Sequence, residues 1–217
     1  MEIVEHYASQ VWKAALKKVL KDGRRITDQD DRQCSETANL VLCVQNPNEG
    51  INEPIDWLSH QGDWVYPSFE QIEKLMLSDA SHSLYEYEYG QRIRRFQGRK
   101  DQLEEFVIPL LSKAPESRRA LISLFDPLQD SNVDNSTVPC LALVFFRIEN
   151  NELSVTGYLR SNDLFIGWPA NAYQLFSLQR FVAAKLGLEI GKLTTVSSSA
   201  HVFLEYEAEF NKLLNEP

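Results

Sequence analysis

The sequence lacks the features that identify several large classes of protein. It has no apolar run of about eighteen residues, so we expect no membrane-spanning helix. The N-terminal residues 1–6 do not have the basic-then-apolar form of a signal peptide. The 3 cysteines are odd in number and widely spaced, which predicts neither a disulfide framework nor a metal site. We therefore expect a metal-free protein of the reducing cytoplasm.

Positive charge is also scarce. The chain has 22 Lys and Arg against 31 Asp and Glu, a net charge of -9. A nucleic-acid-binding protein needs clustered cations for its phosphate contacts, so we expect no nucleic-acid partner. The local basic segments, residues 92–100 and 118–119, could still bind a small phosphorylated ligand. The absence of repeats, linkers and composition breaks predicts one domain, residues 1–217.

The hydrophobic pattern predicts an α+β fold, with a mostly antiparallel central sheet and packed helices. Segments 22–37 and 48–67 are expected to be irregular, and the tyrosines at 85, 87 and 89 suggest the end of a strand. The turn at 149–152 predicts a hairpin. Helices are expected at residues 7–20, 68–77 with Ser68 as the cap, 101–112, 172–186 closed by Gly187, and 207–214. Strands are expected at residues 40–44, 120–125, 139–148, 153–159, 192–197 and 202–206.

Cys140 is the residue with the most direct chemical meaning. It follows Val138-Pro139 at the entry of an apolar run, and the polar segment Arg160-Ser161-Asn162-Asp163 comes later in the chain. A thiolate can add to C6 of a uracil nucleotide and thereby make C5 nucleophilic, and nearby cations favour the thiolate. Arg160 is the candidate cation. On its own, Cys140 is more readily explained as a buried strand cysteine, as expected for Cys34 and Cys43.

Several segments, in this order, resemble the thymidylate synthase family. The resemblance is strongest over residues 85–206, and residues 19–23 with Asp31-Arg32 resemble the family's first helix and phosphate loop. It implies transfer of a one-carbon unit from 5,10-methylenetetrahydrofolate to C5 of a pyrimidine nucleotide, dUMP to dTMP, through a covalent adduct of Cys140 with C6. The matching segments are Tyr89-Gly90, Ser117-Arg118-Arg119, Pro139-Cys140, Arg160-Ser161-Asn162-Asp163, Gly167-Trp168-Pro169-Ala170-Asn171 and His201-Val202-Phe203.

The resemblance also implies roles for individual residues. Arginines match phosphate oxygens bidentately, so Arg118, Arg119 and Arg160 would hold the nucleotide phosphate together with Ser161. In the family the arginine pair reaches into the partner's site, which implies a homodimer. A solvated surface pair is the ordinary alternative for Arg118-Arg119.

The remaining roles concern the base, the sugar and the folate. Asn171 would read N3 and O4 of uracil, although it could also cap a helix beginning at Ala172. Asp163 would bind the pterin ring or serve as a turn residue, and His201 would approach the sugar 3′-hydroxyl or be structural. Tyr89 would order water at C5 or simply pack. A glutamate that manages protons is also required, and Glu53 and Glu70 are the candidates.

Some family residues are replaced. Leu141 stands where histidine is usual, Leu159 where glutamine is usual, and Phe203 where a tyrosine would contact the sugar. The chain is also expected to lack the long C-terminal segment that closes over the ligands. These departures leave open whether the sugar is ribose or deoxyribose. They also keep two alternatives: a nucleotide hydroxymethylase, and a catalytically silent nucleotide-binding relative.

Overall fold

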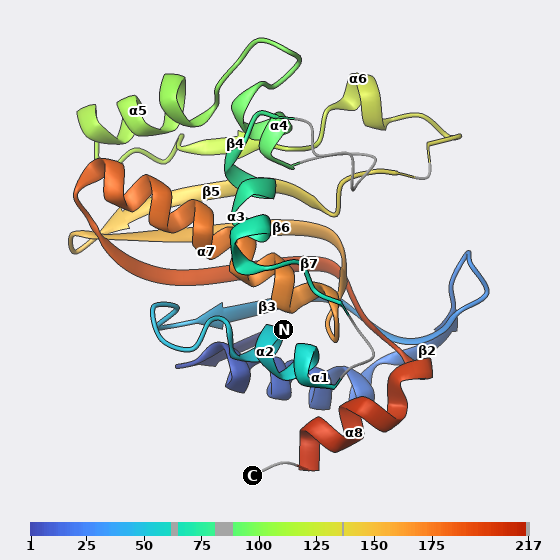
Figure 1. Cartoon of the computed structure of the whole chain (residues 1–217). Helices are drawn as coiled ribbons and strands as arrows, with labels where there is room; N and C mark the ends of the chain where they lie inside the picture. The colour runs from blue at the N-terminus through green and yellow to red at the C-terminus, as the bar shows by residue number, and fades with distance from the viewer. Residues whose placement is uncertain (62–64, 81–88, 136, 216–217) are drawn as a thin grey trace.

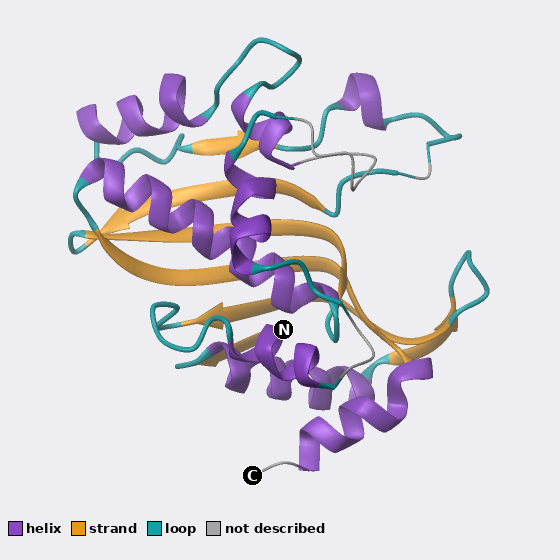
Figure 2. Cartoon of the chain, in the orientation of Figure 1, coloured by secondary structure: helices purple, strands orange, loops and turns teal. Residues whose placement is uncertain are grey.

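The computed structural model describes residues 1–61, 65–80, 89–135 and 137–215. Its centre is a seven-stranded sheet in the order β1-β3-β7-β6-β5-β4, with β2 paired to β3. The β1–β3 and β6–β7 pairs are parallel, and the other pairs are antiparallel, which confirms the predicted mostly antiparallel α+β fold (Figures 1 and 2). The strands are β1 Glu2–Glu5, β2 Arg24–Thr27, β3 Gln33–Val44, β4 Leu121–Ser123, β5 Leu141–Glu149, β6 Glu152–Asp163 and β7 Glu189–Phe203.

The long helices α7 and α1 cover one face of this sheet (Figure 1). In α7 the indole N–H of buried Trp168 donates to Thr195 Oγ1 at 3.0 Å, which ties the helix to β7. A Cβ at Gly157 of β6 would lie 2.6 Å from Leu175 Cδ1, so glycine permits this close packing. The helices are α1 Ala8–Asp22, α2 Glu53–His60, α3 Phe69–Leu77, α4 Tyr89–Arg94, α5 Ile108–Lys113, α6 Pro127–Asp130, α7 Gly167–Leu186 and α8 Glu207–Asn215. A π-helical turn, Leu103–Val107, and a 3₁₀ turn, Leu204–Tyr206, precede α5 and α8.

Predictions based on strong local signals are confirmed. Helix α3 begins after Ser68, whose hydroxyl accepts from the Gln71 N–H in a reciprocal capping box. Helix α7 ends at Gly187, where φ is 67°, in the left-handed region that glycine adopts without strain. Asn150 and Asn151 have φ of 53° and 65°, as a tight β5–β6 hairpin requires.

Other boundaries were predicted wrongly. Segment 22–37 is not irregular, because β2 and the first half of β3 form a polar hairpin there. Segment 48–67 contains α2. The two strands expected at 192–197 and 202–206 are one strand, β7, and residues 204–206 form a 3₁₀ turn instead. Tyr89 begins α4 rather than ending a strand, while residues 85–88 lie outside the described residues.

The sheet bends sharply at one end, where β6 and β7 curve together (Figure 2). On β6 the side chains buried under α7 alternate regularly up to Leu159, but the next buried one is Asn162. On β7 the same interruption occurs, because the next buried residue after Ser197 is Ala200. The two strands stay in register across these positions. The intervening residues, which include Ser161, are thereby turned toward the face that α7 does not cover.

Candidate active site

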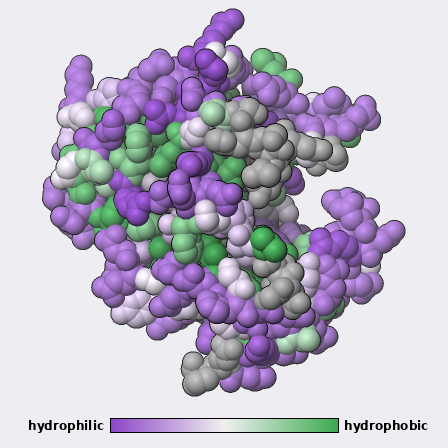
Figure 3. Space-filling view, in the orientation of Figure 1, coloured by the Kyte–Doolittle hydropathy of each residue, from purple (hydrophilic) through white to green (hydrophobic). Residues whose placement is uncertain are grey.

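Two adjoining hollows lie at the bent end of the sheet. They share Gln29 and Asp30 of the β2–β3 turn, and Figure 3 shows a notch between this hairpin and the segment around α6. The first, here called the hairpin pocket, has a volume of about 260 Å³ and is lined by Ile26, Asp28, Gln29, Asp30, Arg32, Cys34, Glu36, Ser161, Ser199, His201 and Phe203. The second, the arginine pocket, measures about 400 Å³ and is lined by Gln29, Asp30, Asn135, Val138 and Arg160.

Cys140 and Arg160 are brought together by the β5–β6 pairing. The Arg160 N–H donates to the Cys140 carbonyl at 2.9 Å. The Arg160 guanidinium donates to the carbonyls of Pro139 and Val138, at 3.1 and 2.5 Å. A fixed cation therefore lies against the segment that carries the free thiol, which is partly exposed.

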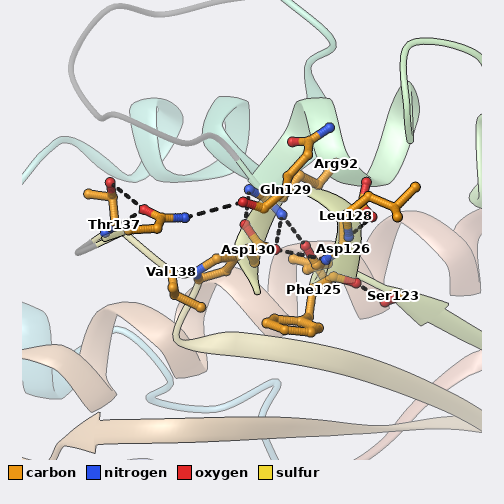
Figure 4. Close-up of polar contacts among 12 residues, drawn as sticks. Arg92, Ser123, Phe125, Asp126, Leu128, Gln129, Asp130, Thr137 and Val138 are labelled. Atoms are coloured by element: carbon orange, nitrogen blue, oxygen red, sulfur yellow. Dashed lines mark hydrogen bonds and ion pairs between the residues drawn. The ribbon is translucent and has the colours of Figure 1, made fainter. Parts of the chain in front are cut away.

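Helix α4 holds the chain on both sides of this segment. The Leu141 N–H donates to the Tyr89 hydroxyl at 3.2 Å. One turn later, Arg92 forks onto both oxygens of the Asp130 carboxylate, at 2.6 and 2.9 Å, and donates to the Leu124 carbonyl (Figure 4). Burial raises the pKa of Asp130, but Arg92 and the Asp126 N–H outweigh it and hold that pKa below its ordinary value. The Arg92–Asp130 pair was missed from the sequence, since nothing local connects residues 38 positions apart.

The hairpin pocket contains His201 and a carboxylate that was not predicted. Glu36 lies opposite His201 in the β3–β7 pairing, and its Oε1 accepts from the Ser199 hydroxyl at 2.5 Å. Burial lowers the pKa of His201, and this outweighs the opposing charges of Glu36 and Asp28. His201 is therefore a neutral imidazole near pH 7. Glu36 was overlooked because segment 22–37 was expected to be irregular.

Arg32 closes one side of the hairpin pocket. Its guanidinium carbon lies 3.3 Å above the centre of the Phe203 ring, a cation–π contact, and Nη2 is 2.5 Å from Glu205 Oε1. A phosphate entering the pocket would therefore meet an arginine that already has an anionic partner.

Asp163 lies where β6 passes into α7. Its Oδ1 accepts the N–H groups of Phe165 and Ile166, at 2.9 and 3.4 Å. Burial raises the pKa of Asp163 to about 6, although these hydrogen bonds and Arg32 act in the opposite direction. The Tyr66 hydroxyl donates to the Ile166 carbonyl at 2.5 Å, and burial raises the pKa of Tyr66. Beside them is an apolar hollow of about 280 Å³, lined by Val65, Tyr66, Pro67, Ile72, Leu75, Ile166, Ala170 and Gln174.

Asn171 is inside α7, not at its N-cap. The helix begins at Gly167, so the alternative role of capping a helix at Ala172 is wrong. Its Nδ2 donates to Oδ1 of buried Asn162 at 3.4 Å, and Asn162 donates to Ser197. Asn171 is thus connected to the bent ends of β6 and β7.

Other candidate residues lie elsewhere. Arg118 and Arg119 are exposed in the segment before the edge strand β4, and neither lines the described hollows. Glu53 accepts from the Ser9 hydroxyl at the start of α1, and Glu70 pairs with Lys74 on the surface of α3. Trp57 packs against Trp12 and Phe165 in the core, while Trp64 is outside the described residues.

The sequence is similar to those of known proteins. A family model described as thymidylate synthase matches residues 51–217. This chain belongs to the thymidylate synthase family. Among its relatives, a Methanosarcina mazei protein named "Putative thymidylate synthase" is 36% identical over 90% of this chain and 86% of its own length. Proteins of the same name from Methanothermobacter thermautotrophicus and Methanocaldococcus jannaschii are 33% and 26% identical, over 93% and 90% of this chain and 91% and 87% of their own.

The described residues contain neither a metal-binding cluster nor a membrane-spanning helix. No group of three or more His, Cys, Asp or Glu side chains there could hold a metal ion. None of the helices described is both long enough and apolar enough to span a membrane.

Proposed function

We propose that this chain transfers a one-carbon unit from 5,10-methylenetetrahydrofolate to C5 of a uracil nucleotide, with conversion of dUMP to dTMP as the leading reaction. The observation that carries the proposal is the guanidinium of Arg160 held against the Cys140 segment, beside a pocket lined by Ser161 and His201. Membership of the thymidylate synthase family supports the same reaction class.

Cys140 is the proposed nucleophile. Its thiolate adds to C6 of uracil, and the electron pair of the C5–C6 bond moves toward C5 and O4, so that C5 becomes nucleophilic. After C5 has accepted the carbon unit, loss of the C5 proton and of the sulfur restores the ring. Tyr89, whose hydroxyl lies at the Leu141 N–H, is the proposed group that orders water for this proton loss. Neither Glu53 nor Glu70, the candidates for the family's proton-managing glutamate, lines a described hollow.

The nucleotide phosphate is proposed to bind at Arg160, Ser161 and Arg32. Among the described residues, three carboxylates and one arginine line the hairpin pocket, so a phosphate dianion there needs additional cations. Arg118 and Arg119 of a second subunit would supply them, consistent with their exposure on this chain.

A homodimer is further supported by the sheet face that α7 leaves uncovered. On it, Val41, Val196, Tyr158 and Leu143 form one row across four paired strands, and Leu121 lies near its end. Tyr158 and Leu121 are 41% and 39% exposed. A contiguous apolar surface of this kind is typical of an interface between subunits.

The base and folate contacts complete the proposal. Asn171 presents an amide, which can both donate to and accept from the uracil edge. The partly buried carboxylate of Asp163 would accept from pterin N–H groups, and the apolar hollow next to Tyr66 and Ile166 would hold the folate rings. The folate supplies the carbon unit and, if a methyl group is made, the hydride. Because the nucleophile must remain a free thiol, we place this single-domain protein in the reducing cytoplasm.

Tritium release from C5-labelled dUMP in the presence of the folate tests the proposal. We expect release from the wild type, and none above background from Cys140→Ser, because serine is a far weaker nucleophile toward C6. Cys43→Ser is the matched control, since Cys43 lies on β3 outside both pockets and its variant should retain release. Normal release from Cys140→Ser, or none from the wild type, would contradict the proposed role.

The reaction mixtures of the tritium-release assay also distinguish the two alternative functions. A hydroxymethylase would also release tritium, but its product would be heavier than dTMP by one oxygen atom. A silent nucleotide-binding protein would bind dUMP without release. The second alternative is favoured by buried Leu141, whose side chain offers no polar group beside Cys140, and by the engagement of Arg32 with Glu205.

A further inference from the structure

Glu36 is an acidic side chain in a pocket that is proposed to bind an anion. It lines the hairpin pocket, lies opposite His201 in the strand pairing and is held through one oxygen by Ser199. Phe203, which lines the same pocket, has no hydroxyl to offer to a ligand. A carboxylate here repels a phosphate, so the part of the ligand that faces Glu36 must be neutral and must donate hydrogen bonds.

The structural partners of Glu36 do not account for its position. Its Oε2 is 3.7 Å from Arg24 Nη2, but the Arg24 side chain is 78% exposed, and such surface pairs contribute little. The neighbouring His201 is neutral, so it does not neutralise the carboxylate. Only Ser199 donates to Glu36 at hydrogen-bonding distance among the described residues, and a carboxylate has about four lone-pair sites.

The arrangement orients a nucleotide along the hairpin pocket. Arg32 and Ser161 can attract the phosphate, whereas Glu36 and His201 form a wall with one anionic acceptor and one neutral imidazole. Because uracil N3–H is assigned to Asn171, the sugar hydroxyls are the donors of a nucleoside monophosphate that remain for such a wall to bind. An acidic residue that accepts from ribose hydroxyls is also the device by which dinucleotide-binding folds hold their sugars.

We propose that Glu36 binds the sugar of the nucleotide and that its carboxylate accepts hydrogen bonds from both ribose hydroxyls, so that a ribonucleoside 5′-monophosphate binds more tightly than its 2′-deoxy counterpart. This inference rests on the proposed function, because it assumes that the hairpin pocket holds a pyrimidine nucleotide. It makes UMP the tighter-binding nucleotide of the same site, while dUMP stays the weaker-binding substrate of the leading reaction. It also assigns to Glu36 a contact that Phe203 cannot make.

Calorimetric titration with UMP, dUMP and 2′,3′-dideoxyuridine 5′-monophosphate tests the inference, since these ligands carry two, one and no ribose hydroxyls. For the wild type we expect the dissociation constant to rise about tenfold with each hydroxyl removed, which corresponds to about 1.4 kcal/mol a step. For Glu36→Ala the three constants should agree within about threefold. Glu36→Gln, which keeps a carbonyl acceptor without the charge, should give intermediate steps.

Glu205→Gln is the matched control, because it removes a carboxylate that pairs with Arg32 but does not line the pocket. It should change the affinity for all three nucleotides by the same factor and leave the hydroxyl steps intact. Thermal melting establishes that each variant is folded. Equal binding of the three nucleotides by the wild type, or unchanged steps in folded Glu36→Ala, would overturn the inference.

The outcomes also separate this inference from the proposed function. If no nucleotide binds, both are overturned. If the hydroxyl steps appear as expected but no tritium is released from UMP or dUMP, the sugar contact holds and the catalytic proposal fails. If tritium is released while Glu36→Ala retains the wild-type hydroxyl steps, the catalytic proposal holds and the sugar contact fails.

Discussion

Replacing Asp163 with asparagine should make the protein more stable and less active. The carboxylate of Asp163 is partly buried, and burial raises its pKa to about 6 from the ordinary 3.8. Asparagine keeps an Oδ1 that can accept from the Phe165 and Ile166 N–H groups, so the start of α7 keeps its hydrogen bonds. What the substitution removes is the negative charge.

The size and sign of the effect follow from linkage. Below pH 3.8 the carboxyl is protonated in both the folded and the unfolded state, and folding carries no penalty from it. Between pH 3.8 and 6 the unfolded chain loses the proton and the folded chain keeps it, so the free energy of unfolding falls by about 1.4 kcal/mol per pH unit. Above pH 6 the loss is complete, at about 3 kcal/mol, and residual solvent contact lowers this toward about 1 kcal/mol.

Urea unfolding of the wild type and Asp163→Asn at intervals from pH 4.5 to 8 measures this difference. We expect the variant to be more stable by no more than about 1 kcal/mol near pH 4.5 and by about 1–3 kcal/mol at pH 7–8. Asp163→Ala is the control, because it loses both the charge and the hydrogen bonds at the helix start. A variant no more stable than the wild type at pH 8, or a difference independent of pH, would refute the reasoning.

The same variant tests the folate contact. If Asp163 binds the pterin ring, Asp163→Asn should raise the KM for the folate while leaving the affinity for dUMP unchanged. Wild-type activity should also fall as the pH is lowered through about 6, since the protonated carboxyl no longer attracts ring N–H donors. An unchanged KM would remove Asp163 from the folate site without affecting the stability prediction.

Three further outcomes are expected. Asp130→Ala leaves a largely buried arginine without its carboxylate and should lower the free energy of unfolding in urea by about 3–5 kcal/mol; a loss below about 1 kcal/mol would contradict the importance of this pair. Gly157→Ala forces a methyl group against Leu175 and should cost about 1–3 kcal/mol in the same assay, whereas an unchanged stability would mean that α7 can shift freely. Mixing inactive Arg118→Ala and Cys140→Ala subunits should restore about a quarter of wild-type tritium release if sites are shared across a dimer, and none if each chain supplies its own arginines.

The parts of the fold that could be predicted are those specified by nearby residues. Gly187 ends α7 because it can adopt positive φ, and Ser68 with Gln71 begins α3 through a reciprocal cap. The β2–β3 hairpin could not be predicted, because its strands are polar and because β3 is held by pairing with β7, more than 150 residues away. The early start of α7 was also missed, although Pro169 is well tolerated in a first turn that needs no N–H partner.

The candidate site divides in the same way. Motif order alone indicated Cys140 and Arg160, and strand pairing brings them together. Residues that act through distant partners carried no sequence signal: Arg92 is identified only by its contact with Asp130, and Glu36 only by its place opposite His201.

The alternation of inward and outward side chains is interrupted at matching positions on β6 and β7. This restricts how the lengths of the two strands can vary. On both strands the next inward residue is the third along, Leu159 to Asn162 and Ser197 to Ala200, and Leu159 pairs with Ser197 as Asn162 pairs with Ala200. Deleting one residue from only one of these strands would turn the side chains of its remaining length to the opposite face. Pocket-lining residues would then enter the core, and core residues would leave it. A change of length in this region therefore has to be made in β6 and β7 at the same time. Natural insertions should be rare here, and protein engineering has to alter both strands together.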